Sequence, residues 1–386
     1  MPSLEQFAKS KLAALEAVHR RRVLAETDRA DAIHVVRDGR AMVSFSCNDY
    51  LNLTHHPAVK AAAVAAIERH GTGAGASRLI TGNHPLYSVL EDRLAQWKGA
   101  EAACVFGSGY LANAGIIPVL VGPDDLVLVD ALSHSCLWAG AQLSRGHVEV
   151  FRHNDADHLR ALLESNRGLY TRTLIVTDGV FSMDGDLAPL AALSALAEHY
   201  DAWLMSDDAH GLGVLGGGHG SASACGEKVK IDLQMGTLSK ALGSYGGYLC
   251  ASRPVIDLIK TRARTLVYST GLPPASVAAA LAALDVMAAD PALCRRPLDN
   301  ARAFTRGCDL ALAESPIVPL ILGEEARALA ASKTLEEEGF LVAAIRPPTV
   351  PAGTARLRFA FTAGHTAADI ARLCTVVRNR ILPQGS

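Results

Sequence analysis

The sequence predicts an α/β fold in which a large domain, built on a mostly parallel β-sheet, is followed by a smaller α+β domain. From residue 101 onward, short apolar runs of strand length alternate with amphipathic helical segments, as in parallel sheets covered by helices on both faces. After residue 290 this pattern changes. With 386 residues, 49% of them hydrophobic, the chain is long enough for a large and a small domain. We expect an N-terminal helix and hairpin over 1–45, the large domain over 46–290 and the small domain over 291–386.

The N-terminal segment is expected to contain one helix and one hairpin. Apolar residues from Leu4 to Val18 recur at helical spacing, which predicts an amphipathic helix over residues 4–22 that ends in the arginine run 20–22. Three arginines at a helix C-terminus suit the helix dipole, and they would equally suit a bound anion, so both interpretations stay open. Asp38 and Gly39 lie between two short apolar runs and predict a hairpin turn.

Glycine, proline and asparagine bound the elements expected in the large domain. A helix is expected over 57–70, with Pro57 in its first turn and Gly71 after its end. Asn83 is expected to cap a second helix, over 84–98. Strands are expected at 102–106, 125–129, 147–151, 172–177, 202–206, 231–235 and 246–251, and a further helix at 274–289.

The small domain is expected to mix strands with helices. Strands are expected at 317–322, 340–345 and 354–361, helices at 324–338 and 367–382, and a proline-rich loop at 346–351. Because side chains alternate along a strand, Arg356 and Arg358 share one face of the last strand. Two arginines on one face favour the binding of a carboxylate, but an exposed strand face gives the same pattern, so both interpretations stay open.

Composition and charge exclude several classes of protein. The 37 basic and 39 acidic residues give a formal net charge of -2, which gives no signal for nucleic acid or a membrane surface. The eight cysteines form no C-x-x-C pair and lie mostly in apolar runs, which indicates reduced thiols. The longest apolar stretch, 275–289, is shorter than the ~20 residues of a membrane helix. With no apolar signal segment at the N-terminus, we expect a soluble, cytoplasmic protein.

The chemistry is expected to centre on Lys240. This lysine lies within the stretch 236–243, read Gly-Thr-Leu-Ser-Lys-Ala-Leu-Gly, after a short apolar run at 231–235 and before a glycine-rich run. The sequence therefore places Lys240 on a tight turn that follows a strand. A lysine alone is most often a solvated side chain, so its significance depends on what surrounds it.

Acidic and imidazole side chains follow a neighbouring strand. The predicted strand 202–206 runs directly into Asp207, Asp208 and His210, and open α/β sheets bind ligands at the carboxyl ends of their strands. A lysine that forms a Schiff base and an aspartate that holds a pyridinium nitrogen are what pyridoxal phosphate requires. A divalent metal is the alternative, but no further ligand has a matching spacing, so we predict none.

A phosphate group would find donors at the ends of two other strands. The strand 102–106 runs into a glycine-containing loop with Gly109 and Tyr110 and then into a helix, and the free N–H groups at a helix start bind phosphate. Thr237 and Ser239 flank the central lysine and add two hydroxyl groups. Ordinary turn chemistry would explain the same two hydroxyls.

Two more candidates lie at strand ends. His134 follows the strand 125–129, where a flat imidazole would stack on a cofactor ring, and Ser182 follows the strand 172–177. The glycines at 211, 213 and 216 match the spacing of a dinucleotide-binding loop, but no helix opens there, which argues against a nicotinamide site.

These motifs together resemble those of the α-oxoamine synthases, pyridoxal phosphate enzymes of the aspartate aminotransferase fold (fold type I). The resemblance covers nearly the whole chain. It rests on the motifs around Asn48-Asp49-Tyr50, Gly73 to Leu79, Phe181 to Gly185, Asp207 to Gly211, and Thr237 to Lys240. The block from Ile345 to Arg358 is similar to the family member of biotin biosynthesis in particular.

The resemblance implies how the cofactor would be held. Lys240 is implied to be the Schiff-base lysine, and Asp207 to hold the pyridine nitrogen. His134 is implied to stack on the ring, with His210 and Ser182 near the ring hydroxyl. Of these, Lys240, His134, Asp207 and His210 are the implied catalytic residues.

The resemblance also implies residues for the phosphate and a second subunit. Gly109, Tyr110 and Thr237 are implied to bind the phosphate, and Thr270 of the partner in a homodimer to complete the site. The active sites would then lie at the dimer interface.

Substrate contacts are implied for a further set of residues. Asn48, Thr349 and Arg358 would face substrate together with His134, and Arg20 would meet the distal carboxylate of the acyl chain. The implied activity is that of an acyltransferase that joins L-alanine to a pimeloyl thioester, on CoA or on a carrier protein, with loss of carbon dioxide. The alternative within the family is glycine with a short acyl-CoA, as in glycine C-acetyltransferase.

Overall fold

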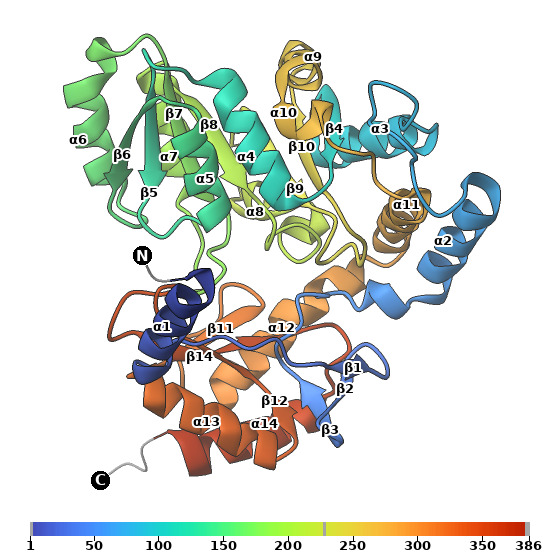
Figure 1. Cartoon of the computed structure of the whole chain (residues 1–386), viewed down its shortest axis with the longest axis vertical. Helices are drawn as coiled ribbons and strands as arrows, with labels where there is room; N and C mark the ends of the chain where they lie inside the picture. Colours follow the sequence, from blue (N-terminus) through green and yellow to red (C-terminus); the bar gives the residue numbers. More distant parts are fainter. Residues whose placement is uncertain (1–2, 227–228, 383–386) are drawn as a thin grey trace.

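The computed structural model describes residues 3–226 and 229–382, and a seven-stranded sheet dominates it (Figure 1). The strands lie in the order β4 (Ala102–Phe106), β10 (Gly247–Ala251), β9 (Leu233–Thr237), β8 (Trp203–Asp207), β7 (Thr173–Asp178), β5 (Leu126–Asp130) and β6 (His147–Phe151). Only β10 runs antiparallel to its neighbours, and the other pairs are parallel. The prediction of an α/β fold with a mostly parallel sheet is confirmed.

Helices cover both faces of this sheet. The strands read as continuous apolar runs because alternate residues enter different cores: Val127 and Val129 of β5 face one core, and Leu126 and Leu128 face another. The first core is covered by α4 (Gly109–Leu120), α5 (Ser135–Leu143), α9 (Arg253–Arg262) and α10 (Arg264–Val267). The opposite face packs on α6 (Ala156–Asn166) and α7 (Leu190–His199), and on α2 (Pro57–His70), α3 (Leu86–Lys98) and α11 (Pro274–Ala289).

A second body below this sheet is built from both ends of the chain (Figure 1). One small sheet contains β1 (Asp28–Arg29), β2 (His34–Arg37), β3 (Arg40–Ser44) and β12 (Phe340–Leu341), and another contains β11 (Ile317–Gly323), β14 (Ala355–Ala360) and β13 (Ala343–Ile345). They pack with α12 (Pro291–Gly307), α13 (Glu325–Glu337) and α14 (Ala367–Val376).

One core joins the two ends of the chain in this second body. Phe45 from the N-terminal segment packs with Phe340 and Phe361 from the C-terminal segment, and all three are fully buried. We therefore propose that the divisions near residues 45 and 290 separate the large domain from one small domain to which segments 1–45 and 291–386 both contribute. The bend of 85° between α11 and α12 lies at the second division.

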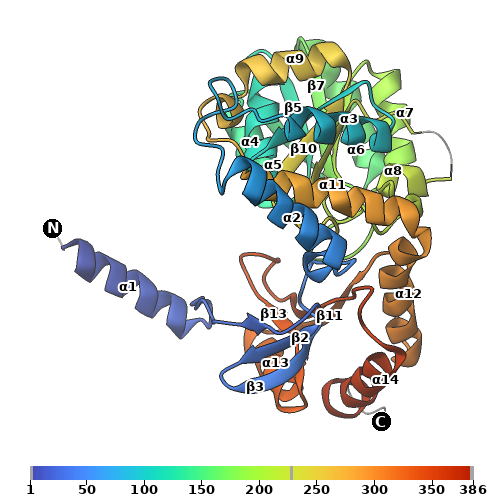
Figure 2. The ribbon, with the colours of Figure 1, turned by 90° about the vertical axis from the view of Figure 1, so that its right-hand side faces the viewer.

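The N-terminal elements agree with the predictions only in part. Asp38 and Gly39 have φ of 51° and 73°, as in the two-residue turn that favours a hairpin, so this prediction is confirmed. α1 (Leu4–Ala17) ends five residues earlier than predicted, because His19 has a left-handed φ of 55° and breaks the helix before the arginines. No residue of α1 is buried, and the helix extends away from the rest of the molecule (Figure 2).

Other differences have local causes. Pro85, and not Asn83, occupies the cap position of α3. The single strand predicted over 340–345 is two strands in different sheets, because the chain changes sheets between β12 and β13. α12 is not anticipated by the sequence pattern, since Pro297 lies inside it.

The remaining elements are short. They are η1 (Leu53–His55), η2 (Arg167–Leu169), η3 (Gly216–Gly218), α8 (Ser221–Ala224) and the π-helical turn η4 (Val377–Ile381) that continues α14. In the part of the chain that the structure describes, no single helix is long and apolar enough to cross a membrane; the bent pair α11 and α12 meets the length and composition test together.

Candidate active site

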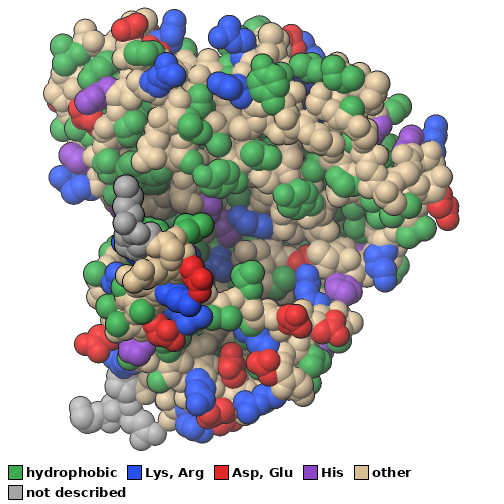
Figure 3. Space-filling model, viewed as in Figure 1, with side chains coloured by type: hydrophobic (Ala, Val, Ile, Leu, Met, Phe, Trp, Pro, Cys, Tyr) green, Lys and Arg blue, Asp and Glu red, His purple; other side chains and the backbone are tan. Residues whose placement is uncertain are grey.

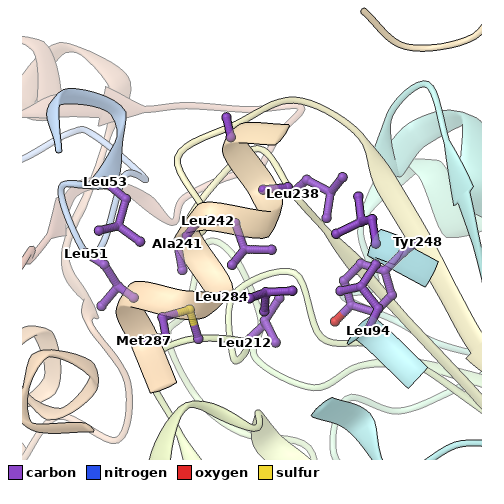
Figure 4. Packing of buried hydrophobic residues seen from close by; sticks show 14 of the residues in the cluster. Leu51, Leu53, Leu94, Leu212, Leu238, Ala241, Leu242, Tyr248, Leu284 and Met287 are labelled. Carbon is purple, nitrogen blue, oxygen red and sulfur yellow. The ribbon is translucent and has the colours of Figure 1, made fainter. Parts of the chain in front are cut away.

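The turn that carries Lys240 is anchored in the apolar core beneath it. Leu238, Ala241 and Leu242 are at most 2% exposed and point into the packed cluster of Figure 4. Gly243 has a φ of 58°, and a Cβ there would meet the backbone of Leu53 at 2.7 Å. The neighbours of Lys240 are therefore fixed by packing, and its own side chain turns toward polar groups.

A chain of hydrogen bonds links Lys240 to three other side chains. Its Nζ lies 2.8 Å from His210 Nε2, and His210 Nδ1 lies 2.6 Å from the Tyr50 hydroxyl. The Tyr50 hydroxyl is 3.4 Å from Asn48 Oδ1. Tyr50, which the sequence did not single out as a site residue, therefore completes a path from the lysine to the predicted substrate residue Asn48.

Burial shifts the pKa values of three of these hydrogen-bonded side chains. It lowers the pKa of Lys240 from 10.5 to about 8, against the opposing effect of the Asp207 carboxylate. It lowers the pKa of His210 well below its usual value, with Lys240 and Arg358 acting in the same direction, and raises the pKa of Tyr50 to about 12. A neutral His210 carries one ring proton, so it donates at one nitrogen and accepts at the other.

Asp207 ends β8 as a buried carboxyl group with three donors, of which the Cys136 thiol, 4.0 Å from Oδ2, is the most distant. Its Oδ1 accepts from the Ala209 N–H at 2.9 Å, and its Oδ2 accepts from Asn113 Nδ2 at 2.7 Å. Asp178 pairs with Asp207 across β7 and β8, and burial, followed by the charge of Asp207, raises the pKa of Asp178 well above its usual value. Asp178 is therefore the carboxyl group of the pair that burial and the neighbouring charge favour in the protonated form.

Asp208 points elsewhere. Its Oδ2 lies 2.8 Å from Lys98 Nζ, and its Oδ1 accepts from the Ser221 N–H. The alternative of a shared metal on Asp207, Asp208 and His210 therefore has no support in the geometry. Within residues 3–226 and 229–382, no group of three or more His, Cys, Asp or Glu side chains is arranged to hold a metal ion.

His134 lies at the edge of a pocket of about 550 Å³, whose lining also includes Ser133, Ser182 and Thr349. Its backbone N–H donates to Asp178 Oδ2 at 2.9 Å, and its ring caps α5. Figure 3 shows a hollow between the two bodies of the molecule, with basic and histidine side chains inside it.

Arg358 reaches from β14 across to the large sheet. It is 6% exposed, donates from Nε to the Ser182 carbonyl, and lies 3.3 Å from Asn48 Oδ1 through each terminal nitrogen. Arg356, equally buried, pairs with Asp184. Burial of both arginines rules out an exposed strand face. In the described part of the chain, Arg358 has no carboxylate within ion-pair distance, so its buried charge is available to an anionic ligand.

The start of α4 is shaped for an anion. Ser108 caps this helix, and a Cβ on Gly109 would lie 3.3 Å from Met235 and 3.7 Å from the Thr237 side chain. Gly109 and Thr237 therefore lie together, as predicted. The Thr237 hydroxyl donates to the Gly246 carbonyl at 2.8 Å and accepts from the Ser239 N–H at 3.1 Å. Tyr110, also in the first turn, is 53% exposed.

The donor set of this site fits pyridoxal phosphate. It offers a lysine amine, a buried carboxyl group that accepts a hydrogen bond at each oxygen, and a helix start lined by Gly109 and Thr237. Ser133 Oγ is buried beside His134 without a hydrogen-bond partner in residues 3–226 and 229–382.

Comparison with known proteins decides the family. The aminotransferase class I and II model matches residues 40–377. The 8-amino-7-oxononanoate synthase of Beijerinckia indica subsp. indica is 63% identical over 98% of both chains, and the protein of the same name from Methylocella silvestris is 64% identical over 90% of this chain and 99% of its own. The chain belongs to the α-oxoamine synthases.

Solved structures of this family are similar throughout. The serine palmitoyltransferase of Sphingomonas wittichii superposes with a TM-score of 0.90 at 29% identity over 98% of each chain. The 8-amino-7-oxononanoate synthase of Francisella tularensis has a TM-score of 0.74 at 26% identity over 88% of this chain and 98% of its own. The serine palmitoyltransferase of S. paucimobilis, at 29% identity, carries a bound PLP–myriocin adduct.

Two residues predicted for this α-oxoamine synthase lie apart from Lys240. Arg20 forms an ion pair with Glu325 at 3.1 Å and lines a separate pocket of about 390 Å³. Thr270 is exposed and forms a bridge with Ser77. Arg22, which donates to Thr349 at 2.6 Å, lines both pockets and connects them.

Sequence reasoning missed several side chains that contact predicted site residues, and three of them lie next to the proposed cofactor residues. They are Tyr50, Asn113 and Cys136. Tyr50 lies in the motif 48–50, two positions after Asn48, and that position is a usable signal. Asn113 is a polar residue in the otherwise apolar helix α4, which marks a buried group with a specific partner.

Proposed function

We propose that the chain catalyses the decarboxylative condensation of L-alanine with pimeloyl-CoA or pimeloyl-[acyl-carrier protein], the reaction of 8-amino-7-oxononanoate synthases in biotin biosynthesis. Relatives of that name are 59–64% identical over nearly the whole chain. The observation that carries the proposal is the buried Arg358, whose charge lies beside Asn48 without an acidic partner among the described residues. An amino acid carboxylate would supply that partner.

Pyridoxal phosphate, when bound, supplies a ring that accepts negative charge from the α-carbon of the amino acid. Lys240 would bind the cofactor through its carbonyl carbon. Asp207 would hydrogen-bond the ring nitrogen, and His134 would stack on one face of the ring. The start of α4, with Gly109 and Tyr110, would hold the phosphate together with Thr237. Ser182 and His210 would lie near the ring hydroxyl.

Lys240 is the proposed acid and base at the α-carbon. Its pKa of about 8 keeps a usable fraction of free amine near neutral pH, which is what a general base requires. The hydrogen bond to the neutral His210, and from there to Tyr50, holds the amine in one orientation.

Substrate orientation is proposed to come from the small domain and the N-terminal segment. Arg358 and Asn48 would hold the carboxylate of alanine, and His134 would hydrogen-bond it as carbon dioxide leaves. Thr349 lines the same pocket as His134, and Arg20 is proposed to meet the distal carboxylate of the pimeloyl chain after release from Glu325.

The assembly is proposed to be a cytoplasmic homodimer with shared active sites. Thr270 is exposed in the single chain, which leaves it accessible to the phosphate site of a partner. Among the described residues it has no contact with Lys240, and the proposal gives it a role only in the dimer.

The test is product analysis of the purified protein with the cofactor. L-alanine and pimeloyl-CoA, or the carrier-protein thioester, should yield 8-amino-7-oxononanoate and carbon dioxide, measured by mass spectrometry. Glycine with acetyl-CoA provides the second arm, because turnover there in place of the first pair would assign glycine C-acetyltransferase activity. Lys240→Ala is the control and should abolish both turnover and the borohydride-reducible cofactor linkage.

A further inference from the structure

Asn113 lies behind the proposed cofactor site, fully buried in α4. Its Nδ2 donates to Asp207 Oδ2 at 2.7 Å and to Cys136 Sγ at 3.0 Å. The two protons of this amide nitrogen therefore form hydrogen bonds to two different elements, the end of β8 and the start of α5.

The orientation of this amide is fixed by chemistry. The Asp207 Oδ2 atom accepts this hydrogen bond, so the amide nitrogen of Asn113, and not its oxygen, faces Asp207. As a consequence Asn113 Oδ1 is buried without a partner in the described residues. An unsatisfied buried carbonyl is unfavourable for folding, so stability alone does not explain an asparagine here.

The second partner, Cys136, connects to His134. The Cys136 thiol lies 2.7 Å from His134 Nδ1, and the Cys136 backbone N–H donates to the same nitrogen at 3.3 Å. A backbone N–H can only donate, so His134 Nδ1 is an acceptor and the ring proton of the neutral imidazole lies on Nε2. The Asn113 amide donates to the thiol sulfur. The thiol proton has two acceptors, His134 Nδ1 at 2.7 Å and Asp207 Oδ2 at 4.0 Å, and the shorter distance assigns it to His134.

We propose that Asn113 is a positioning residue that holds Asp207 directly, and His134 through Cys136, in the orientation in which both face the cofactor. This rests on the proposed function, because it assumes that these two groups contact pyridoxal phosphate. Asn113 itself lies behind them and touches neither the reacting atoms nor the cofactor.

The experiment compares Asn113→Leu and Asn113→Ala with a matched control. Asn300→Ala also removes an amide that makes two hydrogen bonds, to the carbonyls of Thr362 and His365 at 2.9 and 3.2 Å, but it lies in α12 of the small domain. For each variant the dissociation constant of pyridoxal phosphate and the melting temperature of the cofactor-free protein are measured. Asn113 variants should bind the cofactor at least about tenfold more weakly, the loss of one charge-assisted hydrogen bond, whereas Asn300→Ala should not.

The indirect contact from Asn113 to His134 through Cys136 is tested separately, by the tautomer of the His134 ring. In cofactor-free protein with nitrogen-15-labelled histidine, the His134 ring signals should report a proton on Nε2, and Cys136→Ala should mix the two tautomers. His134→Gln identifies these signals. The inference is overturned if cofactor affinity in both Asn113 variants equals that of the wild type, or if Asn300→Ala weakens binding as much. If the wild type binds cofactor but forms neither expected product, the proposed function fails while Asn113 retains its role.

Discussion

Cofactor-free protein should capture pyridoxal phosphate through Lys240 at a rate that rises with pH and levels off above about pH 8. Burial lowers the pKa of this amine from 10.5 to about 8, the Asp207 carboxylate opposes the shift, and the Arg358 guanidinium adds to it. Only the unprotonated amine attacks the cofactor aldehyde, so the capture rate follows the fraction of free amine.

The size of the effect follows from the two pKa values. At pH 7 an amine with a pKa of about 8 is unprotonated in about 9% of molecules, whereas at a pKa of 10.5 the fraction is about 0.03%. The site should therefore present about 300-fold more free amine at neutral pH than a solvated lysine does. This is the gain that the buried position gives to Lys240.

The assay is stopped-flow absorbance of cofactor mixing between about pH 6 and pH 12, a range that brackets both pKa values. Nα-acetyl-lysine under the same conditions corrects for the titration of the cofactor itself. Asp207→Asn removes the opposing charge and should move the midpoint to lower pH, and Arg358→Gln should move it to higher pH. A wild-type midpoint near that of acetyl-lysine, or an upward shift in Asp207→Asn, would refute the reasoning.

Three further predictions concern buried charges. Lys98→Met leaves the 5% exposed Asp208 carboxylate without the cation 2.8 Å away, and breaking such a buried pair costs about 3–5 kcal/mol, measurable as a lower urea midpoint. Arg358→Ala should raise the KM for alanine by about tenfold or more and that for the thioester much less, because a charge-assisted hydrogen bond is worth about 1.5–3 kcal/mol. Although burial opposes it, hydrogen bonds to two aspartates raise the pKa of His153 to about 10. The stabilisation that protonated His153 provides should be complete below about pH 6.5 and lost as pH rises through about 10. The urea midpoint should therefore fall as pH rises over this range, and His153→Gln should make that fall smaller.

A specific result would contradict each of these three predictions, and unfolding in urea can be followed by tryptophan fluorescence. All three tryptophans, Trp97, Trp138 and Trp203, lie in the seven-stranded body, so their fluorescence follows its unfolding without a signal from the small domain. A loss below about 1 kcal/mol in Lys98→Met would mean that the ion pair is solvated. If Arg358→Ala changes the KM values for alanine and for the thioester equally, Arg358 does not bind the alanine carboxylate. If the urea midpoint of His153→Gln depends on pH as that of the wild type does, other groups cause the dependence.

The sequence predicted the seven-stranded sheet well because buried parallel strands are short apolar runs bounded by glycine and polar residues. β4 and β6 have the predicted bounds, and the others differ by one or two residues. The Lys240 turn was predictable for the same reason, since a fixed turn needs apolar neighbours on both sides of the functional residue. Cores and turns are local patterns, and local patterns are visible in one sequence.

Pairings between distant segments were not predictable. Asn113 and Asp207 are 94 positions apart, and nothing near either residue indicates the other. Arg358 was left between two interpretations because its burial depends on Ser182 and Asn48, which lie far away along the chain. The end of α1 depended on the left-handed backbone of His19, a conformation that the local composition does not indicate.

The shared core of the small domain has a consequence for synthesis on the ribosome. Phe45 emerges from the ribosome long before its partners Phe340 and Phe361, which lie about 300 positions later in the chain. All strands of the seven-stranded sheet have been synthesised by residue 251, so this sheet can fold first. Until the C-terminal segment follows, the apolar face of the N-terminal hairpin stays exposed to solvent. Arg358 joins Asn48 only after this last docking step. A nascent chain thus acquires the complete pocket only after β14 has emerged, and termination anywhere before β14 leaves the pocket without Arg358.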